Sequence, residues 1–262
     1  MKTVLQGVIL AGSFVALFFL LQQVDFVTLF KVEQVSDSTE KKLGELLWET
    51  IDATETVVKN DSINDIVEKI IIRITDKNNI DRENFKVHVV KSDEINAFAM
   101  PGDHLVIYTG LIKNCDNESE LAGVICHEIA HIEKNHVMKK LVKEVGLSAL
   151  VSITTGGRSP QLIREITQRL SSAAYDRELE SEADRKAVDY MVKANIDPEK
   201  LADFMYKLAT EEVLPEQMYW ISTHPESKKR AAAILEQIKG VKFVKKPILT
   251  QAEWDFLKSE FQ

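Results

Sequence analysis

The spacing of hydrophobic and polar positions changes along the chain, and each change predicts a different element. From residue 4 to residue 21 nearly every position is apolar, interrupted only by Gln6 and a few small residues. Residues 36–60 then carry leucines, isoleucine and valine at spacings of mostly three and four, which predicts an amphipathic helix. We expect a second helix over 62–76.

The pattern becomes typical of strands in the next stretch. Residues 85–90 (FKVHVV) and 104–110 (HLVIYTG) are rich in β-branched and aromatic side chains, and a turn-forming segment over 100–103 lies before the second of them. This arrangement predicts a β-hairpin between the two stretches.

Helical patterns return at Asn117 and continue to the C-terminal region. Asn117 followed three residues later by Glu120 resembles a capping box in front of an apolar series. Residues 141–155 are apolar but too few to cross a membrane, so a buried or surface-leaning segment is expected. Further helices are expected over 160–174, 177–194, 198–212 and 227–239.

The apolar run at the N-terminus is long enough to cross a bilayer. About 20 apolar residues at ~1.5 Å rise match a hydrocarbon core of ~30 Å. The core of a signal peptide is usually shorter and ends in small residues, and no A-x-A pattern follows this run. We expect an uncleaved signal anchor over residues 1–24, with a cleaved signal and a buried core helix as the alternatives. Because Lys2 and the amino terminus favour the inside, the remaining chain is expected on the outer side.

Composition and charge narrow the class of protein. The chain has 262 residues, 45% hydrophobic and 28% charged, which suffices for one substantial globular domain with an appendage. A net charge of -8 leaves no large basic surface, so nucleic acid is not expected as a partner. The two cysteines, Cys115 and Cys126, would lie ~14 Å apart if a helix begins at Asn117, which is too far for a disulfide.

The segment from His127 to His131 contains the pattern H-E-x-x-H inside a predicted helix. Residues four apart lie on one face of a helix, so both imidazoles can reach one cation while Glu128 points at an adjacent position. Imidazole nitrogens suit zinc, and the carboxylate can take a proton from the attacking water. A shuffled chain would contain this pattern roughly once in a hundred trials, so two packed or solvated histidines on an amphipathic helix are the alternative.

A zinc site of this kind needs a third protein ligand. Lys134 and Val137 exclude the metzincin pattern, which requires glycine and histidine at those two positions. Glu180 and Asp184 are four apart and share a helical face, whereas Glu182 lies about 160° away from both. Glu180 could then bind zinc while Asp184 orients a ligand histidine. The alternative is a solvated acidic helix face.

These motifs resemble those of the zinc metallopeptidases that include HtpX, BepA and the CAAX prenyl protease, in which H-E-x-x-H is followed by E-x-x-x-D. The resemblance extends over roughly residues 85–235 and includes, in order, NAFAMPG, YTGL and ELA at 96–102, 108–111 and 120–122. It implies a zincin-like α+β domain, predominantly α, with a small β-hairpin or sheet packed on the active-site helix. It also implies one Zn²⁺ per chain held by His127, His131 and Glu180, with Glu128 as the general base.

The segment Ser222-Thr223-His224-Pro225, with Arg230 downstream, is similar to the T-H-P-x-x-x-x-R segment of the soluble-domain branch of this family. The resemblance implies that His224 either stabilises the oxyanion or occupies the open zinc position in a resting state. A helix-capping turn before 227–239 is the alternative, since proline suits a first helical turn. His136, five residues beyond His131, should point away from the ligand face and lie at the surface. His88 and His104 alternate within strands and are expected to be solvated or packed.

Together these features predict a membrane-anchored zinc metalloendopeptidase that hydrolyses unfolded or misassembled envelope and membrane proteins. We expect a helical N-terminal segment over 25–84, the metalloprotease core over 85–240 and a C-terminal tail over 241–262. A polypeptide substrate would add as a strand to the exposed edge of the hairpin, near residues 96–108. The competing hypotheses are a chaperone or binding factor with a structural metal, and a purely structural membrane-anchored helical protein. The oligomeric state stays open.

Overall fold

The computed structural model describes residue 6 and residues 37–157, 159–210 and 219–261. Apart from Gln6, the signal anchor expected over 1–24 lies outside the described residues. Among the helices of the described part, none is both long enough and apolar enough to cross a bilayer.

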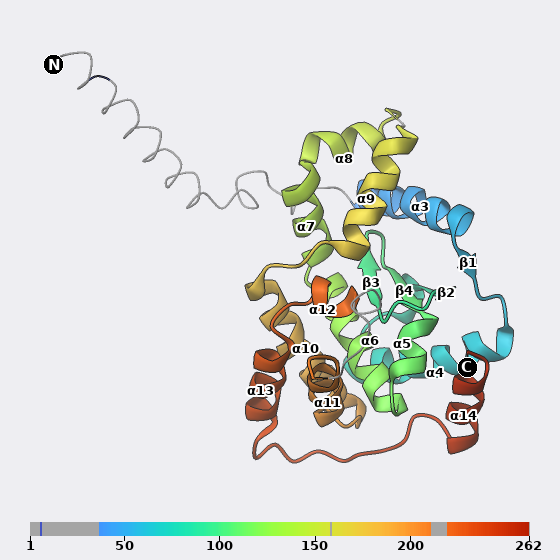
Figure 1. Cartoon of the computed structure of the whole chain (residues 1–262), viewed down its shortest axis with the longest axis vertical. Helices are drawn as coiled ribbons and strands as arrows, with labels where there is room; N and C mark the ends of the chain where they lie inside the picture. The colour runs from blue at the N-terminus through green and yellow to red at the C-terminus, as the bar shows by residue number, and fades with distance from the viewer. Residues whose placement is uncertain (1–5, 7–36, 158, 211–218, 262) are drawn as a thin grey trace.

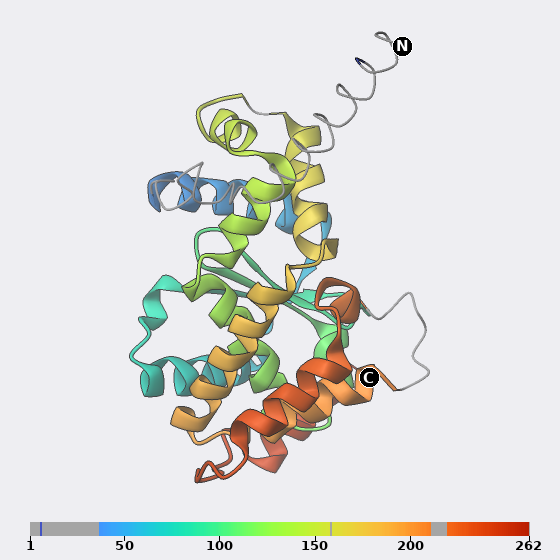
Figure 2. The ribbon, with the colours of Figure 1, turned by 90° about the vertical axis from the view of Figure 1, so that its left-hand side faces the viewer.

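Helices surround one small sheet, which confirms the predominantly helical α+β fold expected from the sequence (Figure 1). The strands are β1 (Thr56–Val57), β2 (Lys86–Lys91), β3 (Ala97–Met100) and β4 (His104–Tyr108). The helices, in chain order, are α3 (Asp37–Thr54), α4 (Asp61–Asn78), the 3₁₀ turn η2 (Arg82–Asn84), α5 (Thr109–Asn114), α6 (Glu118–Glu133), α7 (His136–Val145), α8 (Leu147–Thr154), α9 (Pro160–Ser172), α10 (Arg177–Ala194), α11 (Glu199–Leu208), α12 (Tyr219–Thr223), α13 (Ser227–Ile238) and α14 (Gln251–Ser259). Helices α7 to α9 lie with α3 at one end of the molecule, and α11 and α13 lie at the other (Figure 2).

The sheet has the strand order β1-β2-β4-β3, and its pairing corrects one expectation. Strands β2 and β4 run parallel, so the hairpin expected between 85–90 and 104–110 is wrong. The hairpin partner of β4 is β3, joined to it through a turn in which Gly102 and Asp103 adopt positive φ angles of 70° and 63°. All four residues of β3 are buried, so this short strand shows no alternation that would reveal it in the sequence. Because β3 is last in the strand order, it is an edge strand of the sheet.

Helix α6 runs through the centre of the molecule. Every residue from Glu120 to Ile132 is buried, and the helix packs against α10, α11, α4 and β3. Asn117 caps it by accepting hydrogen bonds from the backbone N–H of Ser119 and Glu120, both at 3.1 Å. The Glu120 carboxylate accepts from the N–H of Asp116 instead of Asn117, so only half of the expected capping box forms. Burial on all sides holds the side chains of α6 in fixed positions.

Most other helices lie where their periodicity predicts them, but the helix expected over 36–60 ends at Thr54, and residues 56–57 form β1 instead. Residues 141–155 divide between α7 and α8 at Gly146, whose φ of 89° suits glycine. The C-terminal tail contains α14, which was not expected, and it starts with a capping box between Thr250 and Glu253. Just before α14, the backbone N–H groups of Ile248 and Leu249 donate hydrogen bonds to the carboxylate of Glu118, at the start of α6, at 2.7 and 2.6 Å. The tail is therefore tied to the first turn of the central helix.

The remaining predictions concern two strand histidines and the two cysteines. His104 is fully buried and its Nδ1 lies 3.0 Å from Nε2 of His88, so this pair is packed, as one of the two expectations had it. The ring of Trp48 stacks on His88 with centroids 3.5 Å apart. Cys115 and Cys126 are both free and buried, which confirms that they form no disulfide.

Candidate metal and active site

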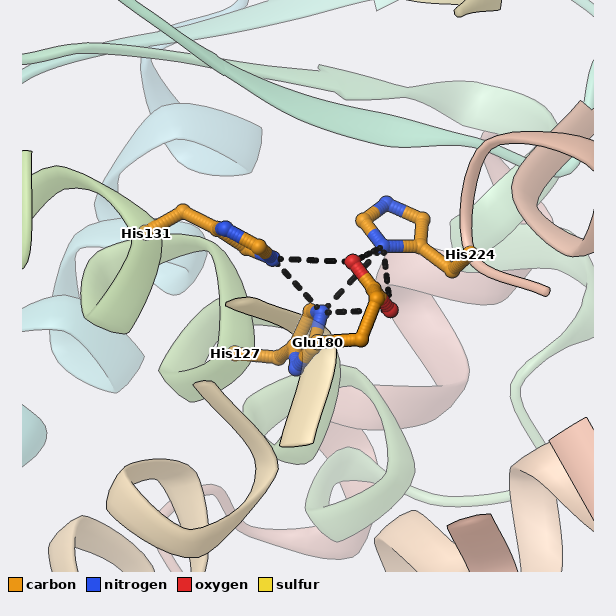
Figure 3. Close-up of side chains that lie close together, drawn as sticks. All are labelled: His127, His131, Glu180 and His224. Carbon is orange, nitrogen blue, oxygen red and sulfur yellow. Dashed lines mark hydrogen bonds and ion pairs between the residues drawn. The ribbon is translucent and has the colours of Figure 1, made fainter. Parts of the chain in front are cut away.

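Four side chains converge at the centre of the molecule. His127 and His131 come from α6, Glu180 comes from the first turn of α10, and His224 follows α12 (Figure 3). One potential ligand atom of each lies within 4.8 Å of those of the other three, and all four residues are buried. The Nε2 atoms of His127 and His131 are 3.0 Å apart, and Oε1 of Glu180 lies 3.3 Å from Nε2 of His131.

These separations fit a divalent cation. Ligand atoms that bind zinc tetrahedrally at ~2.0 to 2.1 Å lie about 3.3 Å from one another. The two Nε2 atoms of His127 and His131 are 3.0 Å apart. Oε1 of Glu180 lies 3.3 Å from Nε2 of His131 and Oε2 lies 3.7 Å from Nε2 of His127, so the three distances lie on both sides of that value. Imidazole and carboxylate are also the donor types that zinc prefers. The chemistry and spacing of the donors therefore match the metal that the sequence predicts.

Asp184, predicted to orient a histidine, lies behind His127. Its Oδ1 is 3.0 Å from His127 Nδ1, the ring nitrogen on the far side from the cluster. Arg230 of α13 donates to both oxygens of Asp184 at 2.7 Å and also forms an ion pair with Glu180. Burial alone would raise the pKa of Asp184, but the hydrogen bonds and charge of Arg230 outweigh it and hold that pKa at about 2. Asp184 is therefore ionised and able to accept the His127 Nδ1 hydrogen.

The pKa of Glu180 is set by a similar balance. Burial would raise it, but His224 and Arg230 together hold it well below its usual range. An ionised, buried carboxylate in the middle of three imidazoles favours a cation at that place.

Glu128 is completely buried and points at the edge strand. Its Oε2 accepts a hydrogen bond from the backbone N–H of Ala99 in β3 at 3.1 Å, and its Oε1 lies 3.4 Å from Nε2 of His224. Burial, followed by the negative charge of Glu180, raises the pKa of Glu128 to about 8. A carboxyl group with a raised pKa beside a set of metal donors is suited to accept and return a proton.

Comparison with known proteins agrees with this arrangement. The family model described as Peptidase family M48 matches residues 58–238, which is more than half of the chain. The chain belongs to peptidase family M48. This membership confirms the resemblance to a metallopeptidase family that was drawn from the sequence motifs.

Several characterised proteins are similar to this M48 chain. The beta-barrel assembly-enhancing protease of Escherichia coli (strain K12) is 24% identical over 237 residues, which cover 85% of this chain and 47% of the relative. The mitochondrial metalloendopeptidase OMA1 of Schizosaccharomyces pombe is 28% identical over 173 residues, covering 65% of this chain and 51% of the relative. The M48 chain thus spans about half the length of the curated relatives it matches.

The prediction that His136 lies at the surface, away from the ligands, is wrong. The residue is fully buried, and its Nδ1 lies 3.0 Å from Nδ1 of His131. A continuous helix would have turned it away, but α6 ends at Glu133 and Asn135 adopts a left-handed φ of 54° before α7 begins. Asparagine tolerates this conformation, and an Asn beside the H-E-x-x-H motif was the available signal for a helix break.

Aromatic side chains that the motifs did not reveal complete the M48 site. The ring of Tyr175 stacks on His131 with centroids 3.9 Å apart and planes 23° apart. The Nζ of buried Lys140 lies 4.2 Å from the centre of the Tyr175 ring and donates to the carbonyl oxygen of Leu170 at 3.0 Å. Trp220 stacks on His224 at 4.8 Å. These contacts restrict the imidazole rings to the orientations seen.

The site is closed to solvent in this conformation. His127, His131 and Glu128 have no exposed surface, and Glu180 and His224 are 1% exposed. Backbone hydrogen bonds hold both ends of α12, from Trp220 N–H to Ile95 O at 3.0 Å and from Tyr175 N–H to Thr223 O at 3.2 Å. A pocket of about 470 Å³ lies between α10 and α13, and Glu180, Asp184 and Arg230 form part of its wall. Glu128 is therefore not accessible to a peptide in this conformation.

Proposed function

We propose that this chain is a zinc metalloendopeptidase that is tethered to a membrane by its N-terminal segment and cleaves unfolded or misassembled envelope and membrane proteins. One observation carries the enzymatic part of the proposal. Two imidazoles from α6 and one carboxylate from α10 bring their donor atoms to separations that suit zinc ligands, with the buried Glu128 carboxylate beside them.

In this proposal His127, His131 and Glu180 hold one Zn²⁺ per chain. When bound, the metal supplies Lewis acidity, which polarises a carbonyl group and lowers the pKa of water to about 7. The Glu128 carboxylate accepts the proton of the attacking water and donates it to the leaving amine. Asp184 keeps the hydrogen of His127 on Nδ1, so that Nε2 retains its lone pair for the metal.

An extended polypeptide would bind by adding a strand to β3. This strand is the edge of the sheet, and the N–H of Ala99 already points at Glu128. Backbone pairing makes little demand on sequence, so it suits a protease of unfolded chains. Since α9 packs against β3 and the α12 segment bonds to Ile95, binding requires one or both of them to move.

Cleavage of unfolded casein is the direct test of the enzymatic proposal. The zinc-loaded chain should cleave casein, a chelator should stop cleavage, and added zinc should restore it. The tether is tested by membrane fractionation, in which the full chain should sediment with membranes and a chain without residues 1–24 should not. If the zinc-loaded chain binds casein without cleaving it, the metal is structural and the chain is a binding factor.

His224 is proposed to occupy the fourth ligand position in the closed conformation. Its Nδ1 lies 2.9 Å from Glu180 Oε1 and 3.2 Å from His127 Nε2, so it belongs to the donor cluster. Replacing His224 with Ala should therefore keep zinc and raise the rate of peptide hydrolysis several-fold, measured with a short fluorogenic peptide. If His224 instead stabilises the oxyanion, the same variant should lose about 10²- to 10³-fold in kcat.

A further inference from the structure

His136 forms the inner part of a chain of polar contacts that begins at the candidate ligand His131. Its Nδ1 faces Nδ1 of His131 at 3.0 Å, and its Nε2 lies 3.4 Å from Oε2 of Glu182. The other carboxylate oxygen of Glu182 forms an ion pair with Lys134 at 3.0 Å. His136 is fully buried, whereas the side chains of Glu182 and Lys134 are 38% and 37% exposed. The contacts thus run from the buried cluster to the surface.

The position of the hydrogens in this chain follows from the geometry. Nε2 of His131 points at His127 and Glu180, so it must be free of hydrogen if it binds a metal. The hydrogen of His131 is then on Nδ1 and is donated to Nδ1 of His136. His136 must in turn accept on Nδ1, carry its own hydrogen on Nε2 and direct it at Glu182.

We infer that His136 is a positioning residue that fixes the tautomer and ring orientation of His131, with Glu182 holding His136 in place. This inference rests on the proposed zinc site. It differs from the arrangement at His127, where Oδ1 of Asp184 lies directly beside Nδ1 at 3.0 Å. At His131 a neutral imidazole stands between the ligand and the carboxylate, so a surface ion pair contributes to the orientation of a buried ligand.

The backbone between α6 and α7 makes this contact possible. In a continuous helix five residues turn through about 500°, which would leave His136 about 140° away from His131. The left-handed Asn135 ends that rotation and returns the chain toward α6, so that His136 opens α7 against the ring it supports. The same Asn135 conformation brings Lys134 and His136 to opposite oxygens of Glu182.

Zinc affinity of His136 variants tests the inference. Loss of a partner that orients a ligand typically weakens metal binding about 10- to 100-fold, and we expect that loss for His136→Leu in a chelator competition assay. His136→Asn should stay within a few-fold of wild type, because Asn Oδ1 can take the place of Nδ1 as the acceptor. His88→Leu is the matched control, since it removes a histidine remote from the cluster and should not change zinc affinity.

A second pair of variants covers the case in which His136→Leu fails to fold. Glu182 is partly exposed, so its replacement should not prevent folding. Glu182→Gln should bind zinc nearly as wild type does, because its amide oxygen still accepts from His136, whereas Glu182→Leu should bind several-fold more weakly. Equal affinity in these two variants would overturn the role of Glu182.

Nitrogen-15 NMR of the zinc-bound chain shows directly which ring nitrogen of each histidine carries the hydrogen, and a purely structural role of His136 would not fix this. The imidazole of His131 should carry hydrogen on Nδ1 and that of His136 on Nε2. A hydrogen on Nδ1 of His136, or a folded His136→Leu with wild-type affinity, would refute the inference while leaving the zinc site intact. A wild-type chain that binds no zinc would refute the proposed function itself.

Discussion

Replacing Glu128 with Gln is expected to lower the rate of peptide hydrolysis by about 10²- to 10⁴-fold while the chain still binds one zinc ion, because the change removes the general base and none of the ligands. The amide has nearly the shape of the carboxylate, and its oxygen can still accept the hydrogen bond from Ala99 N–H. It cannot take a proton from water. The measurement is kcat on a fluorogenic peptide, made beside a zinc determination on the same sample.

Glu133→Gln is the matched control for this experiment. Glu133 lies at the end of the same helix and is exposed, so its replacement should leave kcat unchanged. Cleavage by Glu128→Gln at the wild-type rate would show that another group moves the proton. A loss of zinc together with activity would instead show that Glu128 supports the metal site.

Replacing Glu180 with Gln should weaken zinc binding by more than the 10- to 100-fold typical of an outer partner, since it removes a negatively charged ligand. The variant also leaves Arg230, now opposite a neutral amide, as a buried cation next to the site. That positive charge adds to the cost of binding a second cation. Activity should fall with zinc occupancy and recover in part at high zinc concentration.

The helical part of the site could be predicted because its chemistry is local. His127 and His131 are four residues apart, as are Glu180 and Asp184, and the rotation of an α-helix alone places each pair on one face. The structure brings the two pairs together from α6 and α10, as the motifs predicted. Periodicity within one helix does not specify which helix packs against it. That the two motif-bearing helices meet was inferred from the resemblance to the metallopeptidase family.

The wrong predictions have physical causes that the periodicity of the sequence does not reveal. The pairing of β2 with β4 depends on the intervening β3, whose four buried residues lack an alternating pattern. His136 was placed at the surface by extending one helix through Asn135, although a single left-handed residue changes the direction of everything after it. The contribution of Tyr175 and the closure of the site depend on contacts between segments distant in sequence.

The zinc content of purified chains, measured after exhaustive dialysis, tests the three-ligand site most directly. The account predicts one zinc ion per chain in the wild type and in Glu178→Gln, which changes an exposed acid on the same helix, and little or none in Glu180→Gln. One zinc ion per folded Glu180→Gln chain, held as tightly as in the wild type, would contradict it.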